Sequence, residues 1–353
     1  MASLVDNTFW RGRRVLLTGH TGFKGSWAAL WLCSMGADVR GLSLAPDTTP
    51  SLFELARVDR DVEGGLCDLR DSEAVVAAVR QAKPQIVLHM AAQPLVRRSM
   101  KFPVDTFSVN VMGTAYLLEA LRDEPDLQAV VVVTTDKVYE NPETGIRFAE
   151  GAPLGGHDPY SASKAAAEIL VASYERTYFR ERGIPVATAR GGNVIGGGDF
   201  SEDRIVPDVF RAMQVGQPIM LRNPGATRPW QHVLDCLTGY LAFTQALVTV
   251  PNTPRAMNFG PLLSDDVPVK DLAEAMQRAL GARHGWIAAE GPQPREMKAL
   301  SLDCSLASEW LGFRDRLSGL EAIRATAEWY LSFARGEDMR ARTLNEIRAH
   351  HAA

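Results

Sequence analysis

Short apolar runs alternate with longer amphipathic segments along the first half of the chain. The apolar runs predict β-strands at residues 13–19, 38–44, 84–92, 129–135 and 184–191. The segments between them repeat apolar positions at helical spacing and predict helices at 23–35, 72–83, 104–124 and 161–183. Strands rich in Val, Ile and Leu that alternate with helices are typical of a parallel sheet covered on both faces, the doubly wound α/β (Rossmann) fold.

The pattern changes after residue 191. Two Gly- and Pro-rich loops, at 191–200 and 222–230, flank an amphipathic helix at 205–216, and another helical segment follows at 233–247. This second half predicts a smaller C-terminal substrate lobe over the carboxyl ends of the strands. Because the helix at 233–247 is apolar enough to return to the main sheet, we expect the lobe to be discontinuous. The expected division is a Rossmann domain at 1–191 plus roughly 231–260, and a lobe at 192–230 and roughly 261–353.

Composition narrows the class of protein. The chain has 353 residues, 46% of them hydrophobic, and a net charge of −4, so it lacks the basic excess of a nucleic-acid binder. No apolar run approaches the ~20 residues that span a bilayer, and the N-terminus has no signal-peptide pattern. We therefore expect a cytoplasmic protein with no nucleic-acid or membrane partner.

Cysteine and histidine spacing gives no sign of a metal site. Cys33, Cys67, Cys236 and Cys304 are far apart and form no CxxC pair, which indicates reduced structural thiols. The seven histidines include no HxH or HExxH spacing, so we expect no metal. The terminal pair at 350–351 predicts a solvated tail.

A glycine-rich loop joins the first strand to the first helix. In "LLTGHTGFKG", Gly19, Gly22 and Gly25 would let the backbone turn tightly and approach a pyrophosphate, while the helix N-terminus offers unpaired N–H groups. With a strand before and a helix after, this pattern predicts a dinucleotide-binding site rather than a plain turn.

The GxxGxxG spacing resembles the extended short-chain dehydrogenase/reductase family. The resemblance implies a nicotinamide dinucleotide cofactor and, besides the glycines, contacts from the residues that match the family's positions: Thr21, Phe23, Asp68, Leu69, Ala91 and Ala92. The usual ribose-binding carboxylate at the end of the second strand is missing. Arg40 could bind a 2′-phosphate, as in NADP enzymes, or could be a solvated arginine on a strand edge. We favour the second interpretation and therefore NAD.

"YSASK" places Tyr160 and Lys164 four residues apart on one face of a predicted helix. The pKa of a free tyrosine is about 10, and a neighbouring ammonium should lower it, while the lysine can also bind the nicotinamide ribose. The set resembles the catalytic triad of the family. The resemblance implies that Thr135 contacts the reacting oxygen, Tyr160 is the acid/base and Lys164 its tuner, with Asn110 as the relay asparagine.

Asp136 and Lys137 directly follow the predicted strand at 129–135. They could be a solvated ion pair, but ligands bind at the carboxyl ends of parallel strands, where an acid beside a base could eliminate water. Sugar-nucleotide 4,6-dehydratases carry Thr-Asp-Glu here, with Asp as general acid and Glu as base. Lysine in the glutamate position resembles the CDP-glucose 4,6-dehydratases. The similarity extends over nearly the whole chain, including residues 91–99, 192–200 and 226–235.

The resemblance implies a reaction in three steps. Hydride leaves C4 of the glucosyl ring for NAD while Tyr160 takes the hydroxyl proton. A base then removes the C5 proton while Asp136 protonates the departing C6 hydroxyl, and hydride returns to C6. The product is CDP-4-keto-6-deoxy-D-glucose, and NAD is regenerated while tightly bound. Lys137 is either the C5 base or an electrostatic stabiliser of the enolate.

A nucleotide sugar also brings a diphosphate, which favours arginines and backbone amides. The residues that the resemblance suggests for substrate binding are Gln93, Ser99, Asn193, Arg204, Arg228 and Arg295. Within this set, Asn193 and Arg228 would contact the diphosphate and Arg204 the nucleotide or ribose, whereas Arg295 is the weakest candidate.

Three other functions fit parts of the sequence. A dTDP- or GDP-sugar 4,6-dehydratase would share the chemistry, a nucleotide-sugar 4-epimerase would lack the elimination, and a regulatory protein would only bind the cofactor. The segments at 106–121 and 165–179 are apolar on more than one side, so we expect a homodimer or tetramer. The resemblance also implies deoxysugar biosynthesis for surface polysaccharide such as lipopolysaccharide O-antigen.

Overall fold

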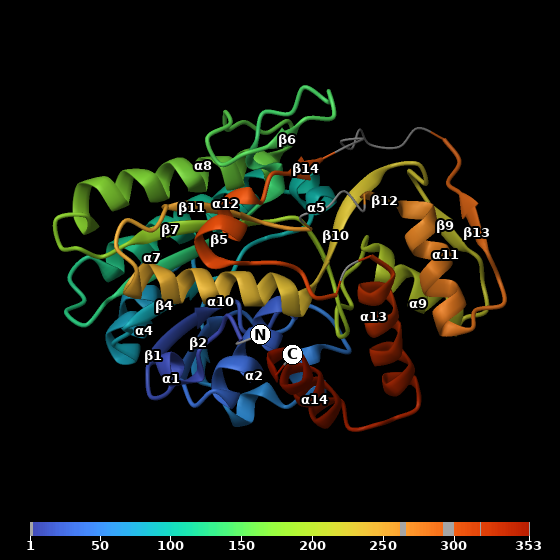
Figure 1. The fold of residues 1–353 in the computed structure, drawn as a ribbon, viewed down its shortest axis with the longest axis horizontal. Helices are drawn as coiled ribbons and strands as arrows, with labels where there is room; N and C mark the ends of the chain where they lie inside the picture. The colour runs from blue at the N-terminus through green and yellow to red at the C-terminus, as the bar shows by residue number, and fades with distance from the viewer. Residues whose placement is uncertain (1–2, 262–265, 292–299, 318, 353) are drawn as a thin grey trace.

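Seven parallel strands form the central sheet (Figure 1). The computed structural model describes residues 3–261, 266–291, 300–317 and 319–352. In spatial order the strands are β11 (Ala256–Phe259), β7 (Val186–Gly191), β5 (Ala129–Thr135), β4 (Ile86–His89), β1 (Arg14–Thr18), β2 (Asp38–Ser43) and β3 (Glu63–Leu66). The order runs outward in both directions from the β1–β4 junction, so the predicted doubly wound fold is confirmed.

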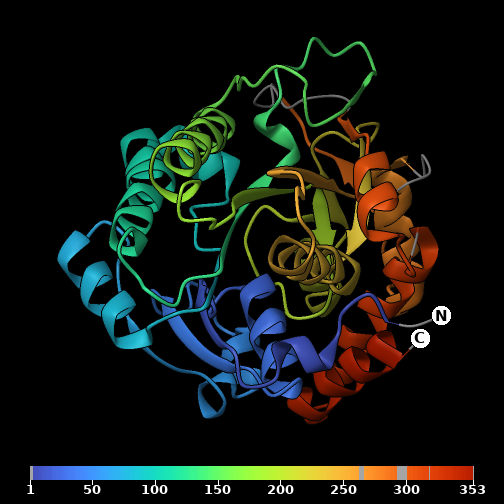
Figure 2. The same cartoon turned by 60° about the vertical axis from the view of Figure 1, so that its left-hand side comes forward.

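Helices cover both faces of this sheet (Figure 2). One layer consists of α4 (Ser72–Ala82), α7 (Gly113–Leu121) and α8 (Pro159–Tyr174), and the other is centred on α2 (Phe23–Ser34) and α10 (Val233–Thr249). The valines of β5 alternate between the layers. Val130 and Val132 pack in the core below α4 and α7, whereas Val131 and Val133 pack in the core that includes α2 and α10. A strand buried on both faces needs apolar residues at every position, which explains the continuous valine run.

The second half of the chain forms a group of small sheets and helices beside the main sheet (Figure 1). Its strands are β8 (Asn193–Ile195), β10 (Thr227–His232) and β12 (Asp266–Pro268) in one sheet, and β9 (Ile219–Leu221) and β13 (Trp286–Ala288) in another. Its helices are α9 (Ile205–Gln214), α11 (Val269–Leu280) and α13 (Gly319–Ala334). Between β10 and β12 the chain forms the helix α10, which packs on the main sheet, and β11, which belongs to that sheet. The predicted domain boundaries stay a prediction.

Shorter elements complete the fold. The short α-helices are α1 (Asn7–Trp10), α3 (Leu52–Leu55), α5 (Val96–Lys101), α6 (Pro103–Phe107) and α12 (Ser305–Leu311). The 3₁₀ turns are η1 (Val58–Arg60) and η3 (Asp136–Val138), and the π-helical turns are η2 (Ser108–Met112) and η4 (Glu175–Phe179). The strands β6 (Arg147–Phe148) and β14 (Ser301–Leu302) pair beside η3. The predicted helix at 104–124 is therefore three successive helical segments.

The C-terminal helix α14 (Met339–Ala352) packs on α2, and the two chain ends lie close together in both views (Figures 1 and 2). His350 is only 7% exposed, and its ring lies edge-on to Trp31 at 5.9 Å between centroids. The expectation of a solvated tail was wrong, because His350 is buried and the rings of both histidines lie edge-on to Trp31. No helix in the described part of the chain has the length and apolar character to cross a membrane.

Candidate active site

The glycine loop after β1 is held in a shape that only glycine allows. Gly19 has φ +77°, and a Cβ there would lie 2.8 Å from the backbone nitrogen of Ala91. A Cβ on Gly25 would lie 2.0 Å from the carbonyl oxygen of Gly19. A Cβ on Gly22 would instead contact only that carbonyl, at 3.4 Å, so nothing in the protein crowds this residue. The loop thus places the N-terminus of the 12-residue helix α2 at the carboxyl end of β1, which suits a diphosphate.

Side chains next to this loop are used to hold it. Thr21 Oγ1 donates to the carbonyl of Leu44 at 2.8 Å and lies 2.7 Å from Ser43 Oγ, which ties the loop to the end of β2. The backbone nitrogen of Ala91 donates to Thr18 Oγ1 at 3.0 Å. Phe23 begins α2, and both it and Ala92 are half-buried. The glycine loop is therefore tied to the end of β2, and the end of β1 to the loop after β4.

Charged residues in the first half of β2 form ion pairs within the protein. Arg40 forms ion pairs with Asp38, at 3.1 Å, and with Glu63 of β3. Two carboxylates on one guanidinium offset the charge that would attract a 2′-phosphate. Arg40 is thus ion-paired on an inner strand rather than solvated on a strand edge. Asp68 binds Arg70, whose hydrogen bonds are the main cause that lowers the pKa of the carboxyl, and Leu69 is buried against the helix at Gly113.

Four predicted site residues are linked behind the β4 loop. Asn110, in the π-helical turn η2, accepts from the backbone N–H of Gln93 at 2.8 Å and donates to Ser163 Oγ at 2.9 Å. Ser163 Oγ donates to the carbonyl of Tyr160 at 2.7 Å, and the N–H of Tyr160 donates to Ser99 Oγ at 3.1 Å. The structure therefore brings Asn110, Gln93 and Ser99 together around the first turn of α8, where they hold the catalytic tyrosine candidate in place.

Gln93 and Ser99 were expected beside the sugar or cofactor. The Gln93 side chain donates to Thr106 Oγ1 at 2.9 Å and accepts from the N–H of Leu95 at 2.7 Å. Ser99 Oγ, fully buried, also donates to the carbonyl of Val96 at 2.6 Å. These partners give both side chains a role inside the protein, and ligand contacts by them stay a prediction.

Tyr160 and Lys164 lie on the first turns of α8, at the carboxyl end of β5. Lys164 Nζ donates to the carbonyl of Val133 at 3.0 Å, and burial followed by the charge of Lys24 lowers its pKa to about 8. Burial raises the pKa of Tyr160 to about 12, although a hydrogen bond with Thr135 and the charge of Arg204 act to lower it. The lowered tyrosine pKa expected from the sequence is wrong for this arrangement, because burial outweighs the neighbouring charges.

Asp136 has an oxygen that points to no partner. Thr135 Oγ1 donates to Asp136 Oδ1 at 2.9 Å, while Oδ2 is buried without a hydrogen bond in the described protein. Burial raises the pKa of this carboxyl, opposed first by Lys137 and then by the Thr135 hydrogen bond. A buried carboxyl with a raised pKa is suited to donate a proton. Lys137 is half-buried in the same turn, η3.

Lys24 is a charged residue of this region that the sequence did not suggest. It lies in the glycine loop, between Phe23 and Gly25, and its Nζ is 5.6 Å from the centre of the Tyr240 ring. Its charge lowers the pKa values of both Lys164 and Asp136. In the sequence, Lys24 is only a lysine in the glycine loop, and a solvated charge at the start of a helix would explain it equally well.

Three predicted substrate residues line the same region from the other side. Arg228 on β10 is 5% exposed, donates to the carbonyl of Thr227 at 2.7 Å, and its charge lowers the pKa of Asp136. Arg204, whose charge acts on Tyr160, lies 3.8 Å from Asp199. Asn193 begins β8, beside β10. Arg295 lies outside the described residues.

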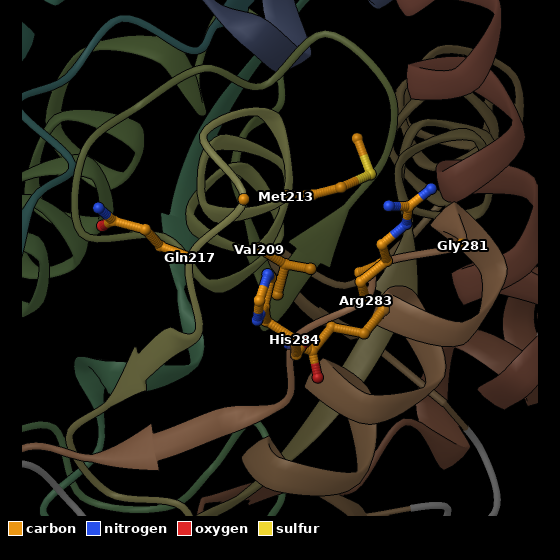
Figure 3. A pocket seen from close by; sticks show the side chains of 9 residues that line it. Val209, Met213, Gln217, Gly281, Arg283 and His284 are labelled. Atoms are coloured by element: carbon orange, nitrogen blue, oxygen red, sulfur yellow. The ribbon is translucent and has the colours of Figure 1, made fainter.

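A separate cavity of about 290 Å³ lies between the ends of α9 and α11 (Figure 3). Val209, Met213, Arg283 and His284 are among its lining residues, and none of the predicted site residues borders it. The predicted site residues lie instead at the carboxyl end of β5, where a phenol, a carboxyl, three lysines and two arginines interact. Among the described residues, no group of three or more His, Cys, Asp or Glu could hold a metal ion.

Comparison with known proteins identifies relatives of this arrangement. The model of the "NAD dependent epimerase/dehydratase family" matches residues 15–260. CDP-glucose 4,6-dehydratase of Salmonella typhimurium is 42% identical over 342 residues, which cover 95% of each chain. dTDP-glucose 4,6-dehydratase of Streptomyces antibioticus is 32% identical, over 90% of this chain and 92% of that protein.

Solved structures of similar fold include UDP-glucose 4-epimerase of Thermus thermophilus in complex with NAD. It has a TM-score of 0.76 and 28% identity, and the match covers 89% of this chain and 98% of that one. An epimerase of Methanothermobacter thermautotrophicus has a TM-score of 0.81 at 21% identity, with 96% and 97% of the two chains covered. With the glycine loop, the sheet order and the family match in agreement, the chain belongs to the NAD dependent epimerase/dehydratase family.

Proposed function

We propose that this protein is a CDP-D-glucose 4,6-dehydratase that uses NAD and releases water and CDP-4-keto-6-deoxy-D-glucose. The observation that carries the proposal is the buried carboxyl of Asp136 at the strand end beside Tyr160, whose Oδ2 has no hydrogen bond to any residue that the structure describes. An epimerase needs no acid for a leaving hydroxyl, whereas a dehydratase does. The 42% identity with a CDP-glucose 4,6-dehydratase supports the same choice.

The cofactor proposal rests on the fit of the glycine loop. Gly19, Gly22 and Gly25 with the start of α2 would hold the diphosphate, and Lys164 the nicotinamide ribose. The pairing of Arg40 with two carboxylates supports NAD over NADP. When bound there, NAD would supply the acceptor for the C4 hydride and the donor for C6.

Each protein group then has one task. As the phenolate, Tyr160 Oη takes the proton of the C4 hydroxyl, assisted by Thr135, and releases it to solvent before the next turnover, because C4 stays a ketone in the product. The carboxyl of Asp136, whose pKa burial raises, gives its proton to the leaving C6 hydroxyl and regains one from solvent. Lys137 either removes the C5 proton or stabilises the enolate, and Arg228 and Asn193 bind the diphosphate, with Arg204 near the nucleotide.

The nucleotide base separates the proposal from its nearest alternative, a dTDP- or GDP-sugar 4,6-dehydratase. Incubation with CDP-, dTDP-, GDP- and UDP-glucose, followed by alkaline ultraviolet absorbance of the keto product, tests both at once. We expect product from CDP-glucose. Keto product from only another nucleotide-glucose would show that the enzyme prefers that nucleotide. Inversion at C4 without keto product from any of the four would favour the epimerase.

We further propose that the protein is cytoplasmic and forms a homodimer or tetramer through the helices on one side of the sheet. Large apolar side chains of α6, η2 and α8 are exposed there: Val104, Phe107, Met112 and Ile169. The reaction would supply deoxysugars for surface polysaccharide such as lipopolysaccharide O-antigen.

A further inference from the structure

A buried ion pair lies one helical turn beyond Lys164. Glu168 is 4% exposed and accepts hydrogen bonds from Thr134 Oγ1 at 2.5 Å and Thr188 Oγ1 at 2.7 Å. Arg190 of β7 donates two more, from Nε at 2.9 Å and Nη2 at 2.7 Å, in a fork. The carboxylate thus has a donor for every lone-pair position, and its charge raises the pKa of Lys164 against the effect of burial.

The same arginine extends to the turn that carries the acid and the second lysine. Arg190 Nη1 donates to Tyr139 Oη at 2.7 Å, and Tyr139 Oη donates to Asn258 Oδ1 at 2.7 Å. Asn258 Nδ2 in turn donates to the carbonyl of Phe148, at 2.8 Å, and the rings of Tyr139 and Phe148 are stacked 5.2 Å apart. Tyr139 directly follows η3 and is fully buried, so its hydroxyl fixes the end of that turn.

We propose that Glu168, Arg190 and Tyr139 are positioning residues: together they hold the ammonium on α8 and the turn η3 in one fixed arrangement for the elimination of water. The inference rests on the proposed function. The reactive oxygen of Asp136 has no hydrogen bond within the described residues, and the carboxyl is held through its other oxygen by Thr135, so its place depends on that contact and on the backbone of η3. A displacement of about 1 Å at a reacting group can slow a step by up to about 100-fold.

Tyr139→Phe tests this with the loss of one hydroxyl at nearly constant volume. In single turnovers with NAD and CDP-glucose, we expect C4 oxidation to stay within about twofold of the wild type and water loss to slow by about tenfold. The absorbance of the reduced cofactor should then build up before product appears. The KM for CDP-glucose should not change, because Asn258 and Arg190, which form hydrogen bonds with the Tyr139 hydroxyl, are not predicted substrate residues.

Thr253→Val is the matched control. Thr253 is 2% exposed, and its hydroxyl donates to two backbone carbonyls at the far end of α10, so the variant also loses a buried hydroxyl. We expect a similar fall in Tm for both variants but build-up of the reduced cofactor only in Tyr139→Phe. The same time course in both variants would overturn the inference, because the hydroxyl would then act through stability alone.

Arg190→Lys gives a second test, since lysine keeps the charge opposite Glu168 but cannot also reach Tyr139 in the same planar fork. A folded Arg190→Lys variant should show the same build-up of reduced cofactor. Unchanged kinetics in that folded variant would contradict the positioning role of Glu168, Arg190 and Tyr139. Wild-type protein that forms no keto product from any nucleotide-glucose would refute the proposed function. An active wild type with unaffected variants would refute only the positioning role.

Discussion

At the scale of single residues, the chemistry depends on the pKa values of three groups in one buried region: Tyr160, Asp136 and Lys164. Burial raises the pKa of Tyr160, to about 12, and that of Asp136. Lys164 differs, because burial and Lys24 lower its pKa to about 8. A raised pKa suits Asp136 to donate a proton, whereas Tyr160 can act as a base only after it has lost its own proton, which the positive charge of bound NAD would favour.

Asp136→Asn should separate water loss from oxidation. The amide cannot donate an acidic proton to the C6 hydroxyl, so we expect the elimination to slow by about 10²- to 10⁴-fold while C4 oxidation changes little. Rapid-quench product analysis measures the rate of water loss, and the absorbance of the reduced cofactor measures the rate of C4 oxidation. Formation of the keto product at the normal rate would end the general-acid assignment.

Lys137→Met should slow the elimination by about 100-fold, whether the lysine removes the C5 proton or stabilises negative charge. Methionine keeps the length of the side chain and removes the ammonium. The measurement is solvent deuterium incorporation at C5 together with the rate of product formation. If both match the wild type, neither role of Lys137 survives.

The motifs predicted which residues lie in the site better than what each side chain does there. "TTDK" and "YSASK" fix positions at a strand end and a helix start, and the structure brings them together. Gln93 and Ser99 were given ligand contacts because of their place in a matching loop. Their hydrogen bonds to Thr106, Leu95, Tyr160 and Val96 depend on packing that a single sequence does not encode in a readable way.

At the scale of elements, strands with a strong burial pattern were predictable and edge strands were not. β5 is buried at all seven positions and its sequence is apolar up to Thr134. β3 reads "EGGL" and is exposed at every position, so no periodicity marks it. It is a strand only because β2 offers it a hydrogen-bonding edge.

The glycine loop gives a prediction at this scale. Gly19→Ala should lower the free energy of unfolding by more than the ~1–2 kcal/mol that a left-handed alanine costs, because its Cβ would meet the backbone of Ala91. It should also abolish NAD binding in calorimetric titration. Gly12→Ala is the control, since Gly12 has φ +71° with nothing within 4 Å of its Cβ. Equal stability and equal NAD affinity in the two variants would contradict the proposed role of the loop.

At the scale of the whole molecule, distant parts of the chain complete one structure. β11 joins the main sheet after the chain has already passed through the second group of sheets, and α14 covers Trp31 of α2. The sequence showed that the helix at 233–247 is apolar, but not which surface α14 would cover, because that surface exists only after folding.

The exposed apolar helices predict the assembly state. Ile169 on α8 is 62% exposed, so Ile169→Glu should place a charge in the proposed subunit contact and shift the protein to monomers. Leu320→Glu on α13 is the control, because Leu320 is 69% exposed outside that surface. Sedimentation velocity measures the state of both. An Ile169→Glu variant that assembles like the control would place the contact elsewhere, or show that there is none.

The central claim is that one active site removes a hydrogen from C4 and delivers it to C6 after water has left. CDP-glucose labelled with deuterium at C4 tests this most directly, with the position of the label in the product read by NMR and mass spectrometry. We predict a 4-keto-6-deoxy product that carries the deuterium at C6. A product without the label at C6, or labelled substrate recovered unchanged in the presence of NAD, would contradict the account.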